Sequence, residues 1–234
     1  MESTVDYFKE QRMNFSPAEA FRSSKPKSDL PDTILDALVG MKKPPIPAFD
    51  GPPMAPVFTW LIENDKSNLY KDDRFTLFLN SSLPYVEQYP LDKAGTASMS
   101  VVHLLACPNE RIYNAVSLLP SDVELLKHMK DTVTRLMDQP FDETDPNNFK
   151  NKCITALDAK MKTQNLGTEL ALRYAADIET FKNTGGSQMR FYFHVHPNHS
   201  VGHLHMHCLE NNLRTSYIHE HKNTSYDDIV SVLN

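Results

Sequence analysis

The distribution of apolar and polar positions divides the chain into a proline-rich arm and a body in which strand-like and helix-like periods alternate. Residues 17–56 contain nine of the sixteen prolines, and proline lacks the N–H and the freedom in φ that helices and central strands require. We therefore predict an arm over 1–56, with one short helix at 28–41 where apolar residues are helically spaced. We expect the arm to pack on the body or on a second subunit, with a floppy tail as the alternative.

The body begins near Val57 and opens with two stretches that indicate strands. "RFTLFLN" at 74–80 and "SMSVVHLLAC" at 98–107 are rich in apolar and β-branched residues and are bounded by turn residues. The period then changes to that of a helix over 121–138, with Ser121 and Glu124 spaced as a capping box.

The second half of the body contains an insertion, two more strands and a final helix. An acidic loop at 138–150 precedes helical patterns at 151–163 and 167–182, so we predict a helical insertion over about 138–186. Strands are expected at 188–195 and 202–209, and a capped helix at the C-terminus. This order predicts one α+β domain over 57–234 with a mainly antiparallel sheet.

Composition places few limits on function. The chain has 40% hydrophobic and 23% charged residues, and no apolar run approaches the roughly 18 residues that span a bilayer. The first residues carry no signal-peptide pattern, so we expect a cytoplasmic protein, with the nucleus as an alternative. A net charge of −6 disfavours long nucleic acid but not a single nucleotide. Three widely spaced cysteines are expected to be free thiols.

Histidines crowd the end of the body, six of the ten falling between His194 and His207. In a strand, His203, His205 and His207 point to one face, while Leu204 and Met206 point to the other. The apolar face would anchor the strand and leave the imidazoles on an open face of the sheet. The preceding strand adds His194, although the register that would place it is not readable from the sequence.

Three interpretations compete for this pattern. A polar sheet face is the simplest, but desolvating several imidazoles together is costly. A metal site is conceivable because imidazole is a common zinc ligand, yet Glu210 falls on the opposite face by parity and no fourth ligand is evident. The third is phosphate chemistry, in which one imidazole attacks phosphorus while its neighbours donate hydrogen bonds. Ser200, three residues before His203, adds a hydroxyl donor.

The motif "HLHMHCL" resembles the signature of the histidine triad superfamily of nucleotide hydrolases and transferases, in which three histidines alternate with apolar residues. The preceding "HSVG" is similar to the Gln-Ser/Thr-Val segment of that family, with His199 where Gln is usual. Upstream, "VVHLLACPNER" resembles the family's strand and proline turn, with Arg111 where a histidine is expected, and Asn80 falls where the family has the Asp or Asn that holds the ribose.

Among the branches of the superfamily, "RFYFHVHPNHSVGHLHMH" is most similar to the scavenger mRNA decapping enzymes. His194 and Pro197 match that branch, which also has Arg near position 111. The large N-terminal domain of the cap enzymes is not evident in the short arm.

The resemblance implies a division of roles among these residues. His205 would attack the α-phosphorus and form a nucleotidyl-imidazole, with His203 positioning it. His207 and Ser200 would donate to phosphoryl oxygens or the leaving group, and Arg111 could clamp a phosphate. His199, Asn80 and His194 complete the expected substrate-binding set.

We therefore expect a HIT-like homodimeric hydrolase that cleaves a nucleoside phosphoanhydride or phosphoramidate, an mRNA cap-like dinucleotide being one candidate, without a cofactor or metal. The alternatives are a non-catalytic nucleotide sensor and a zinc protein with histidine ligands.

Overall fold

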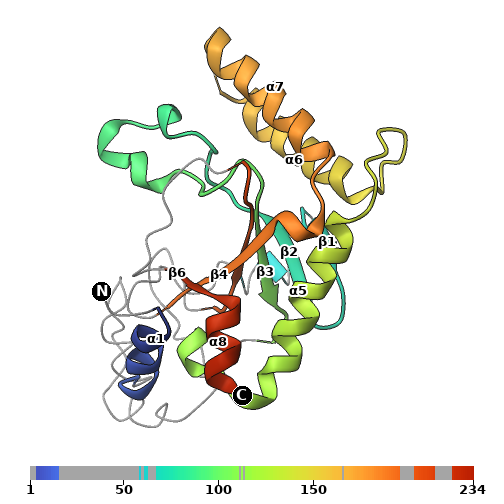
Figure 1. Ribbon diagram of the computed structural model, residues 1–234. Helices are drawn as coiled ribbons and strands as arrows, with labels where there is room; N and C mark the ends of the chain where they lie inside the picture. Colours follow the sequence, from blue (N-terminus) through green and yellow to red (C-terminus); the bar gives the residue numbers. More distant parts are fainter. Residues whose placement is uncertain are drawn as a thin grey trace.

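The computed structural model describes residues 4–15, 58, 61–62, 67–110, 112, 114–164, 166–195, 203–213 and 223–234. These residues form an α+β fold with five α-helices and one six-stranded sheet (Figure 1). The strand order is β1-β2-β3-β5-β4-β6, and each neighbouring pair is antiparallel. The expected class, α+β with a mainly antiparallel sheet, is confirmed.

The strands are β1 (Tyr70–Lys71), β2 (Phe75–Leu79), β3 (His103–Pro108), β4 (Met189–His194), β5 (Met206–Glu210) and β6 (Asn223–Ser225). Two of them begin later than expected. The stretch before His103 bends where the Ser98 hydroxyl bonds to the nearby Ser100 carbonyl, the local competition that serine offers to a strand ladder. β5 begins at Met206, so the first two histidines of the triad motif lie just before it.

The α-helices are α1 (Thr4–Met13), α5 (Val123–Met137), α6 (Phe149–Lys162), α7 (Thr168–Lys182) and α8 (Tyr226–Leu233). The 3-10 turns are η1 (Val86–Gln88), η2 (Leu91–Thr96), η3 (Ala115–Ser117), η4 (Pro120–Asp122) and η5 (Gly186–Gln188). The four helices predicted in the body are confirmed. The Ser121 capping box is wrong, because Ser121 lies inside η4 and Asp122 is the N-cap of α5, where its carboxylate accepts from the Leu119 N–H. The helix predicted at 28–41 lies outside the described residues.

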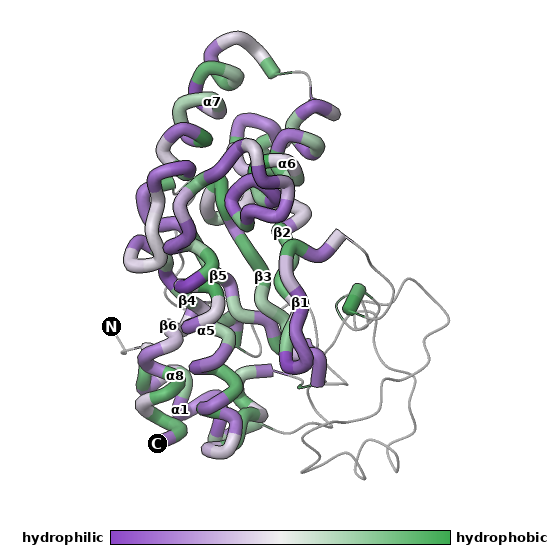
Figure 2. Tube along the Cα trace, turned by 90° about the vertical axis from the view of Figure 1, so that its right-hand side faces the viewer, coloured by the Kyte–Doolittle hydropathy of each residue, from purple (hydrophilic) through white to green (hydrophobic). Residues whose placement is uncertain are grey.

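The two faces of the sheet pack against different partners. On one face, apolar residues of β2, β3, β4 and β5 join the buried faces of α5 and α8 in the main core, including Leu104, Met206 and Leu126. On the other face, Phe78 and Leu105 form a small second cluster with Phe58. Figure 2 shows the hydrophobic central strands beside a hydrophilic β1 at the edge. The triad histidines belong to this second face.

One glycine permits a close approach between η5 and α5. A Cβ added to Gly186 would lie 2.5 Å from the backbone oxygen of Thr134, closer than packed atoms can approach. The Gly186 N–H also donates to the Asp138 carboxylate at 2.7 Å. Only glycine therefore fits where the chain leaves the helical insertion and enters β4.

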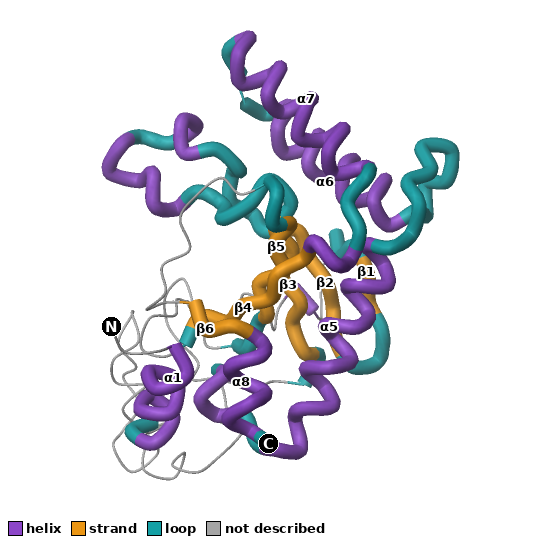
Figure 3. Tube along the Cα trace, viewed as in Figure 1, coloured by secondary structure: helices purple, strands orange, loops and turns teal. Residues whose placement is uncertain are grey.

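Helices α6 and α7 form a hairpin that extends away from one end of the sheet (Figures 1 and 3). Its base packs on the body through buried apolar side chains, among them Leu157, Met161 and Phe181, and polar contacts add to this packing. The Tyr85 hydroxyl donates to the Asp177 carboxylate at 2.6 Å, and the Lys160 ammonium donates to the carbonyls of Asn80 and Ser82 at 2.8 and 2.7 Å. The insertion is thus fastened to the chain just after β2.

No helix among the described residues is long and apolar enough to cross a membrane. The three cysteines are buried free thiols, as the sequence predicts.

Candidate functional site

The histidines of the candidate site come from three neighbouring strands and share one face of the sheet. His207 on β5 pairs with Leu105 on β3 and with Tyr192 on β4. Because residues paired across antiparallel strands point to the same face, His103 lies on this face two positions along β3, and His194 lies on it two positions along β4. The register that the sequence leaves open thus brings both histidines toward the triad.

A continuous chain of hydrogen bonds crosses the face from β2 to β5. The Asn80 amide nitrogen is 2.7 Å from His103 Nδ1, and His103 Nε2 is 2.8 Å from His207 Nδ1. The Ser98 hydroxyl lies 3.0 Å from the same Nδ1 atom of His103. His103 is thereby held by the Asn80 and Ser98 side chains and in turn holds His207.

His205 is oriented by the backbone of its own motif. Its Nδ1 is 2.8 Å from the carbonyl oxygen of His203, and a carbonyl can only accept, so Nδ1 carries the proton. In a neutral imidazole, Nε2 then has the lone pair of a nucleophile. The His203 ring in turn donates from Nε2 to the Pro108 carbonyl at 2.9 Å, and the Leu204 N–H bonds to the Ile112 carbonyl at 2.7 Å. The start of the motif is therefore fixed against the end of β3.

His194 completes a compact group of imidazoles. Its ring centroid lies 3.9 Å from that of His207 and 6.2 Å from that of His205, whereas the His205 and His207 centroids are 4.8 Å apart. One nitrogen from each of these three rings lies within 4.8 Å of the others, so the distances would admit a metal ion. Three neutral imidazoles are a plausible ligand set for zinc or copper.

The histidine face is covered, which corrects the expectation of an open face. His203, His205 and His207 are 1%, 7% and 4% exposed. Phe58 lies over His205 with the ring centroids 4.8 Å apart, and Phe58 and Ile62 pack with Leu105. The Lys71 ammonium holds the end of this covering segment through the Ile62 carbonyl at 2.7 Å. Apolar residues preceding β1 therefore exclude water from the imidazoles.

Burial also sets the charge state of His103. Desolvation lowers the pKa of His103 to about 3, with smaller contributions from the charges of His205 and Lys160. Desolvation likewise lowers the pKa of Lys160 to about 8. His103 is neutral at physiological pH and acts as a hydrogen-bonding group, not as a cation.

The site residues predicted from sequence are only partly described. The structure brings His194, His203, His205 and His207 together, and it places the Asn80 amide against His103. Arg111, His199 and Ser200 lie outside the described residues.

Sequence reasoning missed four residues of the site. None of His103, Ser98, Phe58 and Lys160 is among the site residues predicted from the sequence. The alternation of His103, Leu105 and Cys107 in an apolar strand was the available signal, because it assigns them a common face, but the register with β5 is needed to decide which face it is.

Glu210 lies on the other face, as parity predicts. Its side chain is buried, and its Oε2 accepts from the Leu213 N–H at 2.6 Å, where it holds the turn after β5. It contributes nothing to the group of imidazoles.

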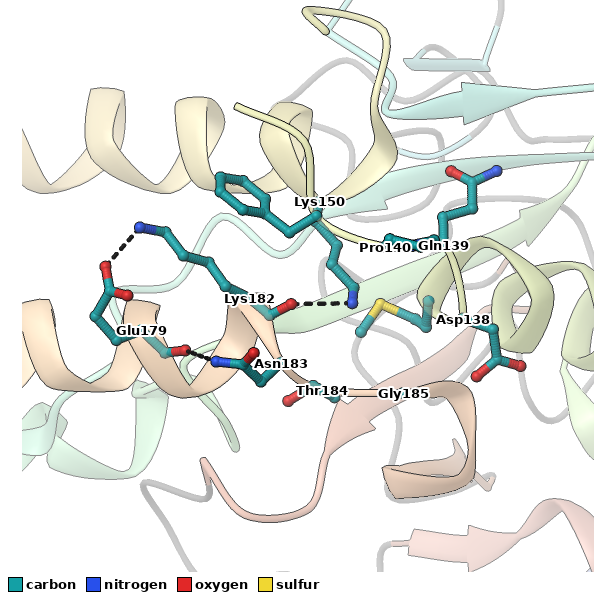
Figure 4. Close-up of a pocket in the computed structure, with 11 residues that line it drawn as sticks. Asp138, Gln139, Pro140, Lys150, Glu179, Lys182, Asn183, Thr184 and Gly185 are labelled. Atoms are coloured by element: carbon teal, nitrogen blue, oxygen red, sulfur yellow. Dashed lines mark hydrogen bonds and ion pairs between the residues drawn. The ribbon is translucent and has the colours of Figure 1, made fainter. Parts of the chain in front are cut away.

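A separate cavity lies where α5, α6 and α7 meet, with a volume of about 540 Å³ (Figure 4). The two lysines that line it have partners within the fold. The Lys150 ammonium donates to the Lys182 carbonyl at 3.2 Å, and the Lys182 ammonium pairs with the Glu179 carboxylate. A lysine at a helix C-terminus stabilises that end of the helix, so these contacts explain the cavity lining structurally.

Comparison of the chain with models of known protein families and with curated proteins gave no match.

Proposed function

We propose that the protein is a nucleotide hydrolase or transferase of the histidine triad type, which cleaves a nucleoside phosphoanhydride or phosphoramidate. The observation that carries this proposal is the pairing of two unlike imidazoles, 4.8 Å apart between ring centroids. His205 has its Nδ1 proton bound to the His203 carbonyl and its Nε2 lone pair available for attack. His207 is bonded through Nδ1 to the neutral His103, and it can donate a proton from Nε2 when His103 is the donor in that bond.

The proposed reaction has two steps. His205 Nε2 attacks the α-phosphorus, a P–N bond forms, and the P–O or P–N bond to the leaving group breaks. The leaving group takes a proton from an acid beside it, for which His207 is the candidate. Water or another acceptor then attacks the phosphorus and gives up a proton to His207, which regains its Nε2–H, while the P–N bond to His205 breaks and the nucleotide leaves.

Burial supports this assignment. The covered histidine face makes hydrogen bonds to a phosphoryl group stronger than they would be in water. Desolvation of several imidazoles is costly, and a catalytic use gives a reason for it. Ser200, His199 and Arg111 are proposed to complete the binding of the phosphates, and Asn80 and His194 are the remaining substrate-binding candidates. A HIT-like homodimer in the cytoplasm is part of the same proposal.

The test is a turnover panel of dinucleoside polyphosphates, nucleoside phosphoramidates and methylated cap analogues. Wild type should cleave at least one class, and His205→Asn should lose at least about 10³-fold in kcat, because no other group replaces a nucleophile. His128→Asn is the matched control, because His128 lies on α5 and pairs with Asp72 between β1 and β2, outside the group of imidazoles. Nucleotide binding with no turnover anywhere in the panel would favour a non-catalytic sensor.

A further inference from the structure

The side chain of Asn80 is held at both ends, and this fixes which end faces the histidines. Its Oδ1 accepts from the Ser82 N–H at 2.9 Å, and only an oxygen can accept there. The Nδ2 of Asn80 must therefore be the atom 2.7 Å from His103 Nδ1. The Lys160 ammonium keeps this turn in place by binding the carbonyls on both sides of it.

An amide N–H can only donate, so His103 Nδ1 has to be an unprotonated acceptor. A proton on Nδ1 would place two N–H groups head to head at 2.7 Å. The nearby Ser98 hydroxyl does not decide the matter, because it is 2.8 Å from the Ser100 carbonyl and can rotate to suit either state of His103. The amide cannot turn over without leaving the Ser82 N–H unpaired.

The proton position on His103 determines the proton position on His207. With Nδ1 unprotonated, neutral His103 carries its proton on Nε2 and donates it to His207 Nδ1 at 2.8 Å. His207 Nδ1 is then the acceptor, and neutral His207 has its proton on Nε2. His205 beside it has the opposite tautomer, with the proton on Nδ1 and the lone pair on Nε2.

We infer that Asn80 is a positioning residue that sets the proton positions on His103 and His207, so that His207 presents an N–H beside the lone pair of His205. These proton positions also oppose metal binding by His194, His205 and His207. A metal requires a lone pair from each ligand atom, and His207 Nε2 has none in this state. The catalytic meaning of this inference rests on the proposed function, but the proton positions do not.

This role differs from that of a residue that holds the ribose, and kinetics separates the two. A ribose contact would bind ground state and transition state alike, so its loss would raise KM with kcat unchanged. If the proton positions are lost, the His207 Nε2–H that donates in the transition state is lost as well. Asn80→Ala should therefore lower kcat by about 10²-fold with KM little changed.

The direct experiment is NMR of the full chain labelled with ¹⁵N in histidine, using correlations between ring nitrogens and carbon-bound protons at pH 7.5. His103→Gln and His207→Gln variants assign the two rings. We expect both residues to be neutral with the proton on Nε2, and His205 to carry its proton on Nδ1. A His103 or His207 proton found on Nδ1 in the wild type would overturn the inference, whatever the protein's activity.

Three variants test whether the Asn80 amide determines the proton position on His103. In Asn80→Asp the carboxylate can only accept, so His103 Nδ1 should gain a proton, whereas Asn183→Asp at the C-cap of α7 makes the same chemical change and should leave His103 as it is. Ser98→Ala should also leave His103 unchanged. A His103 Nδ1 that stays unprotonated in Asn80→Asp would show that the amide does not set the proton position.

Discussion

At the residue scale, the surroundings of a side chain decide its chemistry more than its type does. His205 and His207 are two positions apart in one motif, yet one bonds to a backbone carbonyl and the other to a second imidazole. This gives the two rings different tautomers and different uses. Glu210 shows the same principle on the opposite face, where burial raises the pKa of its carboxyl.

We predict that Glu210→Gln stabilises the protein at neutral pH. A raised carboxyl pKa means that the folded state favours the protonated form, so stability is highest below the ordinary pKa and falls as pH rises through the folded-state value. Glutamine keeps an oxygen for the Leu213 N–H and carries no charge. Thermal unfolding should show a Tm gain of a few degrees at pH 8 that shrinks at pH 4. Glu143→Gln on the exposed loop is the control, and a Tm below wild type at pH 8 would contradict the prediction.

At the scale of elements, the sequence predicts which segments form helices and strands but not how the strands pair. The helical spacing of α5 and the apolar and β-branched content of β2 and β4 are local properties, and these three elements were predicted correctly. The pairing of β3 with β5, which brings His103 to His207, depends on contacts between residues 104 positions apart, and no local pattern encodes it. For the same reason the sequence predicted the helical insertion but not that its Lys160 reaches the turn after β2.

The buried Lys160 should make stability depend on pH. Burial lowers its pKa to about 8 from 10.5, so above pH 8 the folded state releases a proton that the unfolded state keeps. Stability should therefore rise, relative to Lys160→Met, as pH increases from 8 to 10.5. Urea unfolding of both proteins at pH 7.5 and 10 measures this difference. Lys162→Met, which changes an exposed lysine on the same helix, should show no such change, and a flat difference for Lys160→Met would contradict the assignment.

At the scale of the whole molecule, the two ends of the described chain are packed together. Phe8 of α1 is completely buried in the main core, and the Thr4 hydroxyl donates to the Asp228 carboxylate of α8 at 2.7 Å. The Arg12 guanidinium donates to the carbonyls of Val116 and Leu118. The adjoining Asn114 amide donates to the His194 carbonyl at 3.1 Å. The first helix therefore supports the loop that borders the group of imidazoles.

Phe8→Ala should destabilise the fold by about 3–5 kcal/mol, the usual cost of removing a buried phenylalanine from a core. Met13→Ala, at a side chain 78% exposed on the same helix, should cost less than about 0.5 kcal/mol. The midpoints of urea unfolding compare the two. Equal midpoints for both variants would mean that α1 contributes nothing to the core.

The central claim is that His205 is the nucleophile, and a covalent nucleotidyl-histidine is its most direct signature. The wild type is mixed with a substrate that it cleaves in the turnover panel. The reaction is quenched in alkali to preserve the P–N bond, and the protein is examined by intact and peptide mass spectrometry. The account predicts one nucleotidyl group per chain, mapped to His205 and absent from His205→Asn. An adduct on another residue, or undiminished turnover by His205→Asn, would contradict it.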